Sequence, residues 1–326
     1  ELSKSYNITV IHSGNKSVLV TDSYNEIIVK QYNIFGFILQ SKILKEVLNS
    51  KYYKIIVMFD LHFINNILTY FIVSNKRFIW WGPWLTNKII IDHLKLFFSR
   101  KSTTIFYSQD ELNRFKSKDI DGNRLFLANN TFDVGTRYKC YKHVIKDSIL
   151  FVGSFNKRKQ LDVLIMAFHN SLNRIPNHIN LVLIGDGQEL IVIKNLVSNL
   201  KIEHRVLFKG ALNDNKELIK FYKRSIVSVS FGQAGLSVLQ AMGFGVPFVT
   251  KRNAISGGEK TNIKHGINGY FAEDKLESLE NILQMICNDQ IKARELGKNA
   301  YEYYSEKCTV GNMANGFIKA IESNYK

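Results

Sequence analysis

The segment with the clearest chemical potential is the glycine-containing loop Phe231-Gly-Gln-Ala-Gly-Leu236. It follows the apolar run 226–230, which predicts a buried parallel strand, and precedes leucine and methionine residues at helical spacing. Gly232 and Gly235 let the backbone approach a ligand, and the first turn of a helix attracts negative charge. The loop therefore predicts a phosphate or diphosphate site. A strand-to-helix turn that binds no ligand is the alternative, because glycine often occurs in turns and loops for structural reasons alone.

Apolar runs alternate with helical patterns along the whole chain, which predicts βαβ units and parallel sheets. The first set of predicted strands covers residues 8–11, 17–21, 26–30, 54–58, 77–81, 104–107 and 124–127. The second set covers residues 149–152, 179–184, 205–209, 225–230 and 246–250. The stretch 129–147 is charged and aromatic without periodicity, and we predict that it links the two sets. We expect an α/β fold of two Rossmann-like, doubly wound lobes facing across a cleft, with the ligand at the carboxyl ends of the strands.

Five motifs occur in one order: Phe151-Val-Gly-Ser-Phe-Asn-Lys-Arg-Lys159, Leu181-Val-Leu-Ile-Gly-Asp-Gly187, the 231–236 loop, Gly257-Gly-Glu259 and His265-Gly-Ile-Asn-Gly269. In this order they resemble the C-terminal half of the retaining GT-B glycosyltransferases of the family 4 type, the glycosyl transferases group 1. The Gly-x-x-Gly-Leu loop is similar to that of the polysaccharide- and O-antigen-assembling branch. The resemblance is strong from residue 149 to about 305 and weaker before.

The resemblance implies a division of the chain. Residues 1–140 would form an N-terminal acceptor-side lobe, residues 147–305 a C-terminal nucleotide-sugar lobe, and residues 310–326 a helix that packs back on the first lobe. A GT-B lobe normally opens with an earlier strand and a glycine loop, whereas this chain opens on Glu1-Leu-Ser-Lys-Ser-Tyr6. We therefore expect the N-terminal lobe to lack its first strand and helix.

The resemblance also implies which residues bind the donor. Lys159 stands at the position of the phosphate-binding lysine, and Lys157 or Arg158 would replace an arginine that relatives carry where this chain has Ser154. A solvated basic loop is the alternative for this cluster. The expected donor-binding residues are Gly153, Ser154, Arg158, Lys159, Gly185, Gly187, Lys209, Gly210, Gly232, Gln233, Ala234, Gly235, Leu236 and Gln240.

The chain departs from the family at two positions. Most relatives carry two glutamates eight positions apart, one for the donor sugar and one for the ribose hydroxyls; here those positions are Gly232 and Gln240. Gln240 can hydrogen-bond a ribose without the strength of a carboxylate, and Gly232 has no side chain. Ser237 and Gln233 could add polar contacts. We expect Glu259 to replace the missing carboxylate, with a helix N-cap or a surface acid as the alternative.

Candidate acceptor-side residues lie in the first half of the chain. The resemblance places His12 and Gly14 at the end of a strand on the acceptor side, although a packed core histidine is the alternative. The expected catalytic residues are thus Lys159, Glu259 and His12. The tryptophans Trp80, Trp81 and Trp84 could stack on a sugar or pack in the core. Ser108 and Asn130 are expected at the edge of the cleft.

The formal net charge of +16 calls for an anionic partner. Nucleic acid is not expected, because the lysines are dispersed and no nucleic-acid-binding signature occurs. Residues 88–101 combine basic and apolar side chains and predict a helix on an anionic membrane surface; a solvated helix face is the alternative. No apolar stretch is long enough to span a bilayer. The few, scattered cysteines predict a reducing cytoplasm, so we expect a cytoplasmic protein, peripheral on the inner membrane face.

The sequence as a whole resembles a retaining, metal-independent hexosyltransferase of cell-surface polysaccharide synthesis. It would move a hexose or related sugar from a UDP- or GDP-linked donor to a glycan or lipid-linked acceptor, with no bound cofactor. No Asp-x-Asp motif is apparent, and the histidines lack metal-ligand spacing, so no metal is expected. One alternative is a catalytically silent GT-B subunit that binds nucleotide sugar or a partner enzyme. Another is a nucleotide-sugar epimerase.

Overall fold

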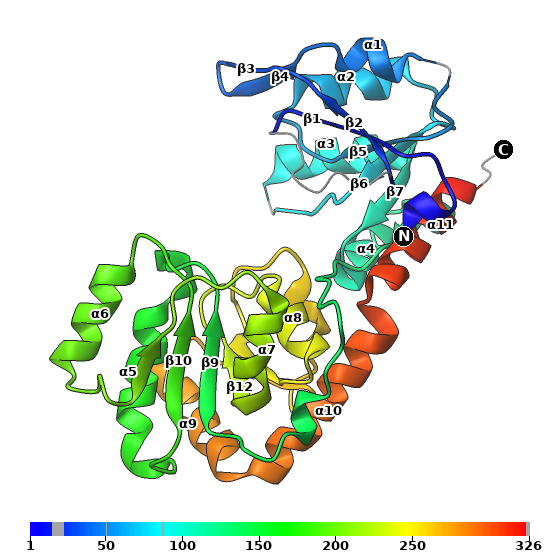
Figure 1. Cartoon of the computed structure of the whole chain (residues 1–326). Helices are drawn as coiled ribbons and strands as arrows, with labels where there is room; N and C mark the ends of the chain where they lie inside the picture. The colour runs from blue at the N-terminus through cyan, green and yellow to red at the C-terminus, as the bar shows by residue number, and fades with distance from the viewer. Residues whose placement is uncertain (15–22, 50, 87, 324–326) are drawn as a thin grey trace. The chain divides into compact units, whose positions relative to one another are not determined.

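The computed structural model describes residues 1–14, 23–49, 51–86 and 88–323. The chain forms two compact units, shown in Figure 1. The N-terminal unit consists of Glu1–Asn129 and Val310–Lys326, and the C-terminal unit consists of Asn130–Thr309. The strand predicted at residues 17–21 lies outside the described residues.

The C-terminal unit contains a six-stranded parallel sheet in the order β11-β10-β9-β12-β13-β14. Its strands are β9 (Ser148–Val152), β10 (Asn180–Ile184), β11 (Val206–Phe208), β12 (Ser225–Val229), β13 (Phe248–Lys251) and β14 (Gly269–Ala272). The five strands predicted from apolar runs are confirmed, with small shifts at their ends. The short strand β14 was not predicted, because it carries few branched residues and falls inside a glycine-rich motif.

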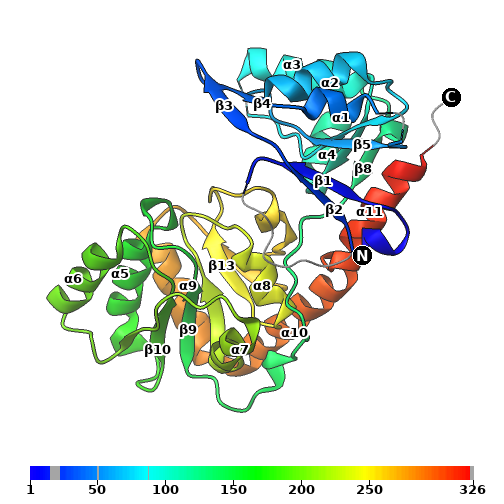
Figure 2. The same cartoon turned by 45° about the horizontal axis from the view of Figure 1, so that its top comes forward.

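Helices cover both faces of this sheet, which explains why its strands are continuous apolar runs. Ile149 and Phe151 of β9 belong to one core and Leu150 to another, because successive side chains point to opposite faces. The first core includes residues of α5 (Leu161–Ser171), α6 (Leu190–Asn199) and α9 (Leu276–Asn288). The second includes residues of α7 (Asn215–Arg224), α8 (Ser237–Gly243) and the latter part of α10 (Gln290–Lys307). Figure 2 shows α8 beside β13.

The strand order reverses at β9. The chain passes from β9 outward to β10 and β11, and then returns to place β12 on the other side of β9. The connections after β9 and β12 therefore leave the sheet in opposite directions at its carboxyl edge. Ligands of doubly wound folds bind in the crevice that such a reversal creates.

The N-terminal unit contains a four-stranded parallel sheet in the order β5-β6-β7-β8 and two two-stranded sheets. The strands are β1 (Thr9–His12), β2 (Asn25–Ile28), β3 (Gln31–Ile34), β4 (Phe37–Gln40), β5 (Ile55–Met58), β6 (Phe78–Trp81), β7 (Thr103–Phe106) and β8 (Leu125–Leu127). The helices are α1 (Ile43–Val47), α2 (Ile64–Ile72), α3 (Ile89–Arg100), α4 (Gln109–Lys116) and α11 (Val310–Glu322). All predicted strands of this half that lie in the described residues are confirmed.

The antiparallel hairpin of β3 and β4 was missed in the sequence. Its two turn residues, Phe35 and Gly36, have φ angles of 48° and 83°. Positive φ at both central residues is the geometry of a type I′ turn, which matches the twist of the flanking strands. The glycine between two apolar segments was the available signal, but a phenylalanine at the first turn position is unusual.

Aromatic packing fills the core of the N-terminal unit. Trp80 is fully buried, with the rings of Phe59 and Phe78 at centroid distances of 4.5 and 4.6 Å. It therefore cannot stack on a sugar at the surface, and the core alternative holds for this tryptophan. On the other face of the sheet, Phe317 and Ile321 of α11 share a core with strand residues.

The predicted linker, residues 129–147, packs in the C-terminal unit from Asn130 onward, with Val134 and Cys140 buried in its second core. At its end, the buried Lys146 donates a 2.7 Å hydrogen bond from Nζ to the carbonyl of Ser225. Burial lowers the pKa of Lys146 to about 8. The hydrogen bond of this lysine joins the segment before β9 to the start of β12. Burial makes the charged form of its side chain less stable than it is in water.

We predict that Lys146 makes stability depend on pH. The unfolded chain holds the Lys146 proton with a pKa of 10.5 and the folded chain with a pKa of about 8, so folding releases it between these values. When the pH is raised from 7.5 to 9.5, the free energy of unfolding of the wild type should increase by roughly 2 kcal/mol more than that of Lys146→Met. Urea unfolding at both pH values measures this difference. Lys142→Met, at an exposed position, should show no such change; parallel pH curves for wild type and Lys146→Met would contradict the prediction.

Candidate active site

Bare backbone lines the carboxyl edge of the C-terminal sheet. Gly153, Gly185 and Gly210 follow β9, β10 and β11. The amide of Gly153 donates to the carbonyl of Ile184 at 3.0 Å, and the amide of Gly185 donates to the carbonyl of Gly210 at 2.8 Å. A Cβ atom on Gly185 would lie 1.8 Å from the carbonyl oxygen of Gly153, so only glycine allows this approach. These glycines therefore let the loops after the strands pack closely together, with the side chains of Phe155 and Lys159 beside them.

Lys159 lies over this edge. It ends the 3-10 helix η4 (Lys157–Lys159), and its Cε lies 3.6 Å from where a Cβ of Gly153 would stand. Burial lowers the pKa of Lys159, the neighbouring Arg158 lowers it further, and the charge of Glu259 raises it. Within the described part of the chain, the ammonium group makes no hydrogen bond. Lys159 is thus a partly desolvated cation, and an anion bound beside it would relieve the cost of its burial.

Three loops meet at this point through main-chain hydrogen bonds. The amide of Gly232 donates to the carbonyl of Lys159 at 3.1 Å, which joins the loop after β12 to η4. The amide of Ile255 donates to the carbonyl of Gly232 at 3.0 Å, and the amide of Ala234 donates to the carbonyl of Ile255 at 2.8 Å. Gln233 pairs with Ile255 in an isolated parallel bridge. These main-chain bonds join the three loops, and the hydroxyl of Ser230 adds a 2.7 Å bond to the carbonyl of Gln233 within the loop after β12.

Gly232 has a structural reason to be glycine. A Cβ atom there would lie 2.3 Å from the carbonyl oxygen of Arg158 and 2.7 Å from Cγ of Gln160. Gln160 itself has a φ angle of 52°, an uncommon conformation for a residue with a side chain. No glutamate can therefore occupy position 232 unless η4 moves.

Glu259 is a buried and fixed carboxylate, with only 6% of its surface exposed. Its Oε1 accepts a hydrogen bond from Nδ2 of Asn130 at 2.9 Å. Its Oε2 accepts from the hydroxyl of Ser256 at 3.0 Å and from the amide of Gly257 at 2.9 Å. The N-cap residue of its 3-10 helix, η6 (Glu259–Asn262), is Gly258. Glu259 is therefore neither an N-cap nor a surface acid, and its charge acts on Lys159.

Gln240 is held by its own protein. It is 5% exposed, and its Oε1 accepts a hydrogen bond from the hydroxyl of Tyr222 at 3.0 Å. Its Nε2 donates to Oδ1 of Asn215 at 3.3 Å. A contact between Gln240 and a ribose would have to replace one of these bonds. The hydroxyl oxygen of Ser237, in the first turn of α8, is buried and makes no hydrogen bond in the described part of the chain.

The other expected donor-binding residues are exposed at the surface of the unit. Ser154 is exposed and accepts a hydrogen bond from Nδ2 of Asn156 at 2.8 Å. Gly187 is exposed, as is Leu236 with 44% of its surface accessible. Lys209 and Gly210 follow β11, which is separated from β9 by β10. The structure brings together the following expected residues at the strand reversal: Gly153, Arg158, Lys159, Gly185, Gly232, Gln233, Ala234, Gly235 and Glu259.

A separate pocket of about 560 Å³ in the N-terminal unit contains His12 and Gly14. The Nδ1 of His12 accepts from the amide of Gly14 at 3.0 Å, and its Nε2 lies 2.9 Å from Oε1 of Glu26. The neutral ring must then carry its proton on Nε2 and donate it to Glu26. Both ring nitrogens are thus engaged, so His12 would have to break one contact to act as a base. Ser108, 1% exposed, is the N-cap of α4 and not a surface residue.

Sequence reasoning did not find the partners of Glu259. Asn130 was expected at a cleft edge and Ser256 was not singled out. The spacing Ser256-Gly-Gly-Glu259 was a possible signal, because a serine three residues before a glutamate is a common local hydrogen-bonding pattern. The contact with Asn130 joins residues far apart in sequence and had no local signal.

Among the described residues, no group of three or more histidine, cysteine or acidic side chains could hold a metal ion. The three cysteines are free and buried, and burial raises the pKa of Cys140 to about 11 and that of Cys287 to about 12. None of the helices in the described ranges is both long and apolar enough to cross a membrane.

Comparison with known proteins relates the C-terminal unit to a known family. Residues 142–303, which hold the strand reversal with Lys159 and Glu259, match the family model described as glycosyl transferases group 1. The C-terminal unit matches that family over most of its length. N-acetyl-alpha-D-glucosaminyl L-malate synthase of Bacillus anthracis is 30% identical over 161 residues, which is 49% of this chain and 41% of that protein. Poly(glycerol-phosphate) alpha-glucosyltransferase of Bacillus subtilis is 24% identical over 67% of this chain and 32% of its own. The chain spans less than half the length of these curated relatives.

Solved structures show that the chain has the fold of GT-B glycosyltransferases. HepE of Anabaena, solved in complex with UDP, has a TM-score of 0.70 at 14% identity, over 97% of this chain and 99% of its own. TarM of S. aureus, solved as a mutant with UDP and sugar ligands, has a TM-score of 0.62 at 17% identity, over 82% of this chain and 55% of its own. The expected α/β fold with parallel sheets is confirmed.

We predict that position 232 tolerates no side chain. Gly232→Ala should destabilise the C-terminal unit by about 1–3 kcal/mol, because its Cβ would press on the Arg158 carbonyl. Gly232→Glu should destabilise it at least as much, because the larger side chain begins with the same Cβ atom. Thermal and urea unfolding measure the change. The matched control is Gly235→Ala in the same loop, where a Cβ would meet nothing within 4 Å; equal stability of the two alanine variants would show that the close approach does not exist.

Proposed function

We propose that this chain is a retaining glycosyltransferase of the family 4 type. It transfers a hexose or related sugar from a nucleotide donor to a glycan or lipid-linked acceptor in cell-surface polysaccharide synthesis, of the kind that assembles O-antigen or lipopolysaccharide. The observation that carries the proposal is the position of Lys159, a desolvated cation over the bare backbone of Gly153 at the strand reversal, within electrostatic reach of Glu259. A diphosphate fits this edge because it needs cations and open N–H groups.

The comparisons favour UDP over GDP in the donor. Structures of HepE, TarM and the pneumococcal O-GlcNAc transferase GtfA contain UDP. By their names, relatives act on poly(glycerol-phosphate), poly(ribitol-phosphate) and lipopolysaccharide core. These acceptors support a polymeric or lipid-borne acceptor for this chain. The buried free cysteines suit a reducing cytoplasm, and there the chain would work peripherally on the inner membrane face.

The proposed reaction proceeds by front-side attack. The bond between the anomeric carbon and the diphosphate oxygen breaks, and the acceptor hydroxyl oxygen bonds to the same face of that carbon. The hydroxyl proton passes to the departing diphosphate oxygen. Lys159 stabilises the negative charge that develops on the diphosphate, and no metal or bound cofactor is needed for this role.

Glu259 would bind the donor sugar. A carboxylate offers about four acceptor positions, and Asn130, Ser256 and Gly257 use three of them. The remaining position can accept a sugar hydroxyl. Since Gly232 cannot carry a glutamate, Glu259 supplies the carboxylate that most relatives place in the loop.

The alternative is a catalytically silent subunit that binds nucleotide sugar or a partner enzyme. It is favoured by the steric exclusion of any side chain at Gly232 and by the engagement of Gln240 with Tyr222 and Asn215. The two functions differ in one measurable respect, because a silent subunit binds the nucleotide and transfers nothing.

We predict that Lys159→Met lowers kcat/KM for a UDP-sugar by roughly 100- to 1,000-fold, because it removes transition-state charge stabilisation. Transfer of radiolabelled sugar to a lipid-extract acceptor, with product analysis, measures the rate. Lys220→Met is the matched control, since Lys220 is an exposed lysine on α7. UDP binding in a thermal-shift assay without turnover on any acceptor would establish the silent subunit. Donor isomerisation without an acceptor would instead identify an epimerase.

We further predict that Glu259→Gln lowers kcat about tenfold or more while UDP affinity changes little. The amide keeps the size of the side chain but presents a poorer acceptor to the sugar hydroxyl. Steady-state kinetics together with UDP titration separate the two effects. An equal loss of UDP affinity would place Glu259 at the nucleotide and not at the sugar.

A further inference from the structure

The side chain of Gln160 fills the space beside Gly232. A Cβ atom on Gly232 would lie 2.7 Å from Cγ and 2.8 Å from Oε1 of Gln160. Gln160 follows Lys159 directly, and the carbonyl of Lys159 accepts the hydrogen bond from the amide of Gly232. The polar end of Gln160 thus lies where a side chain of the loop after β12 would otherwise begin. Gln160 was not among the donor-binding residues expected from the sequence.

The backbone of Gln160 is held in an unfavourable conformation. Its φ and ψ angles are 52° and 49°, in the left-handed region that favours glycine. Two main-chain bonds fix this conformation. The amide of Gln160 donates to the carbonyl of Lys157 at 3.1 Å, and its carbonyl accepts from the amide of Leu164 at 3.3 Å. Backbone strain of this kind is concentrated at functional sites, so it points to a use for the side chain.

The oxygen of the Gln160 amide group has no hydrogen-bond partner. Oε1 is buried and accepts no bond within the residues that the structure describes. Two other buried side-chain atoms on the loops of the candidate site share this condition in the described ranges: Oδ1 of Asn156 and the hydroxyl oxygen of Ser237. Buried polar atoms are rarely left in this state in a folded protein. A ligand that carries hydroxyl groups would supply the missing partners.

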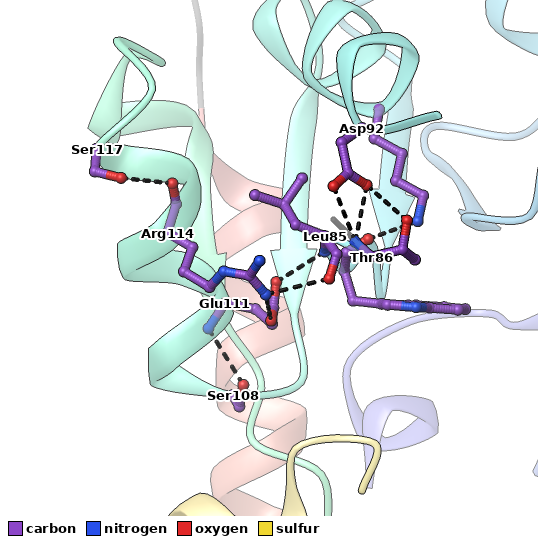
Figure 3. Close-up of polar contacts among 9 residues, drawn as sticks. Leu85, Thr86, Asp92, Ser108, Glu111, Arg114 and Ser117 are labelled. Carbon is purple, nitrogen blue, oxygen red and sulfur yellow. Dashed lines mark hydrogen bonds and ion pairs between the residues drawn. The ribbon is translucent and has the colours of Figure 1, made fainter. Parts of the chain in front are cut away.

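A polar cluster of the N-terminal unit shows the opposite condition. Figure 3 shows how side chains of α3 and α4 hold the segment that follows β6. Oε2 of Glu111 accepts from the amide of Leu85 at 3.0 Å, and Oδ1 of Asp92 accepts from the amide of Thr86 at 2.8 Å. These two carboxylates are occupied by the chain itself and stabilise its fold. The acceptor of Gln160 has no such structural use.

The amide group of Gln160 can turn toward a ligand at small cost. The residue as a whole is only partly buried, and the last torsion angle of a glutamine side chain has a broad energy minimum. Gln160 also borders a pocket of about 200 Å³ together with Asp162 and Phe231, so its side chain has space to move. No hydrogen bond to Oε1 has to be broken within the part of the chain that the structure describes.

We propose that Gln160 binds the donor sugar, an assignment that extends the proposed function and rests on it. A diphosphate held by Lys159 leaves the attached sugar within reach of Gln160, the next residue in the chain. The oxygens of an ionised diphosphate cannot donate a hydrogen bond to Oε1, but a sugar hydroxyl group can. Oε1 of Gln160 therefore accepts a hydrogen bond from one sugar hydroxyl group, while Glu259 binds another.

Titration with a UDP-sugar, without any acceptor, tests this assignment. Gln160→Met keeps the length of the side chain and removes the acceptor. It should weaken the binding of UDP-glucose or UDP-N-acetylglucosamine, whichever the wild type binds more tightly, roughly 3- to 10-fold, and leave the affinity for UDP unchanged. Isothermal titration calorimetry measures both affinities. Lys201→Met is the matched control, because Lys201 is exposed, has a φ angle of 56° and precedes β11 at the opposite edge of the sheet.

Donor analogues identify the hydroxyl group that Gln160 binds. Each hydroxyl group of the sugar is replaced in turn by fluorine, which cannot donate a hydrogen bond. For the hydroxyl group bound by Gln160, the replacement should weaken binding to the wild type about as much as Gln160→Met does. It should have no further effect on the variant, because the two changes remove the same bond. A residue that only supports the loop would show the same analogue pattern in both proteins.

A glycine variant separates the sugar contact from stability. Glycine adopts the left-handed conformation of residue 160 without strain, so Gln160→Gly should unfold at the same temperature as the wild type or at a higher one. It should nevertheless lose as much affinity for the UDP-sugar as Gln160→Met. Thermal unfolding and the same titration measure the two effects.

Three outcomes would overturn the assignment. An equal loss of UDP affinity in Gln160→Met would place the residue at the nucleotide. An unchanged affinity for the UDP-sugar, or an analogue pattern that is the same in both proteins, would make Gln160 a structural residue and leave the proposed function intact. If the wild type binds no UDP-sugar at all, the proposed function fails together with this assignment.

Discussion

The main-chain contact between Lys159 and Gly232 is the constraint on which the candidate site depends. Lys159 follows β9 and Gly232 follows β12, and these neighbouring strands lie where the sheet order reverses. The two loops meet closely because one of them has no Cβ atom at the point of contact. This contact sets the height of the lysine above the sheet and the path of the loop toward α8. The bond from Ile255 then brings in the segment that carries Glu259.

The site places two opposite charges in partly buried positions, but it treats them differently. The carboxylate of Glu259 accepts three hydrogen bonds from its own protein, which offset the cost of its desolvation. Lys159 has no such compensation among the described residues and relies on the field of Glu259. A bound anion would supply the missing partner. Because a bound anion would compensate the burial of Lys159, the site is more stable with its ligand than without it.

The strands of the C-terminal sheet could be predicted because they are covered on both faces and are therefore apolar throughout. The hairpin of β3 and β4 escaped prediction because Phe35 occupies a turn position that usually selects asparagine or glycine. Within the site, the sequence singled out Lys159 and Glu259 through their motifs. The crowding around Gly232 and the bond from Asn130 depend on residues distant in sequence, and no local pattern encodes them.

The main-chain bonds between these three loops also affect how the site can evolve. The bonds that join these loops run between amides and carbonyls, so the side chains of Gln233, Leu236 and Ile255 contribute nothing to them. New side chains at these positions can alter the shape and polarity of the surface without shifting Lys159. A scaffold with this property can acquire new substrate preferences through single substitutions, while the chemistry-bearing groups stay in place.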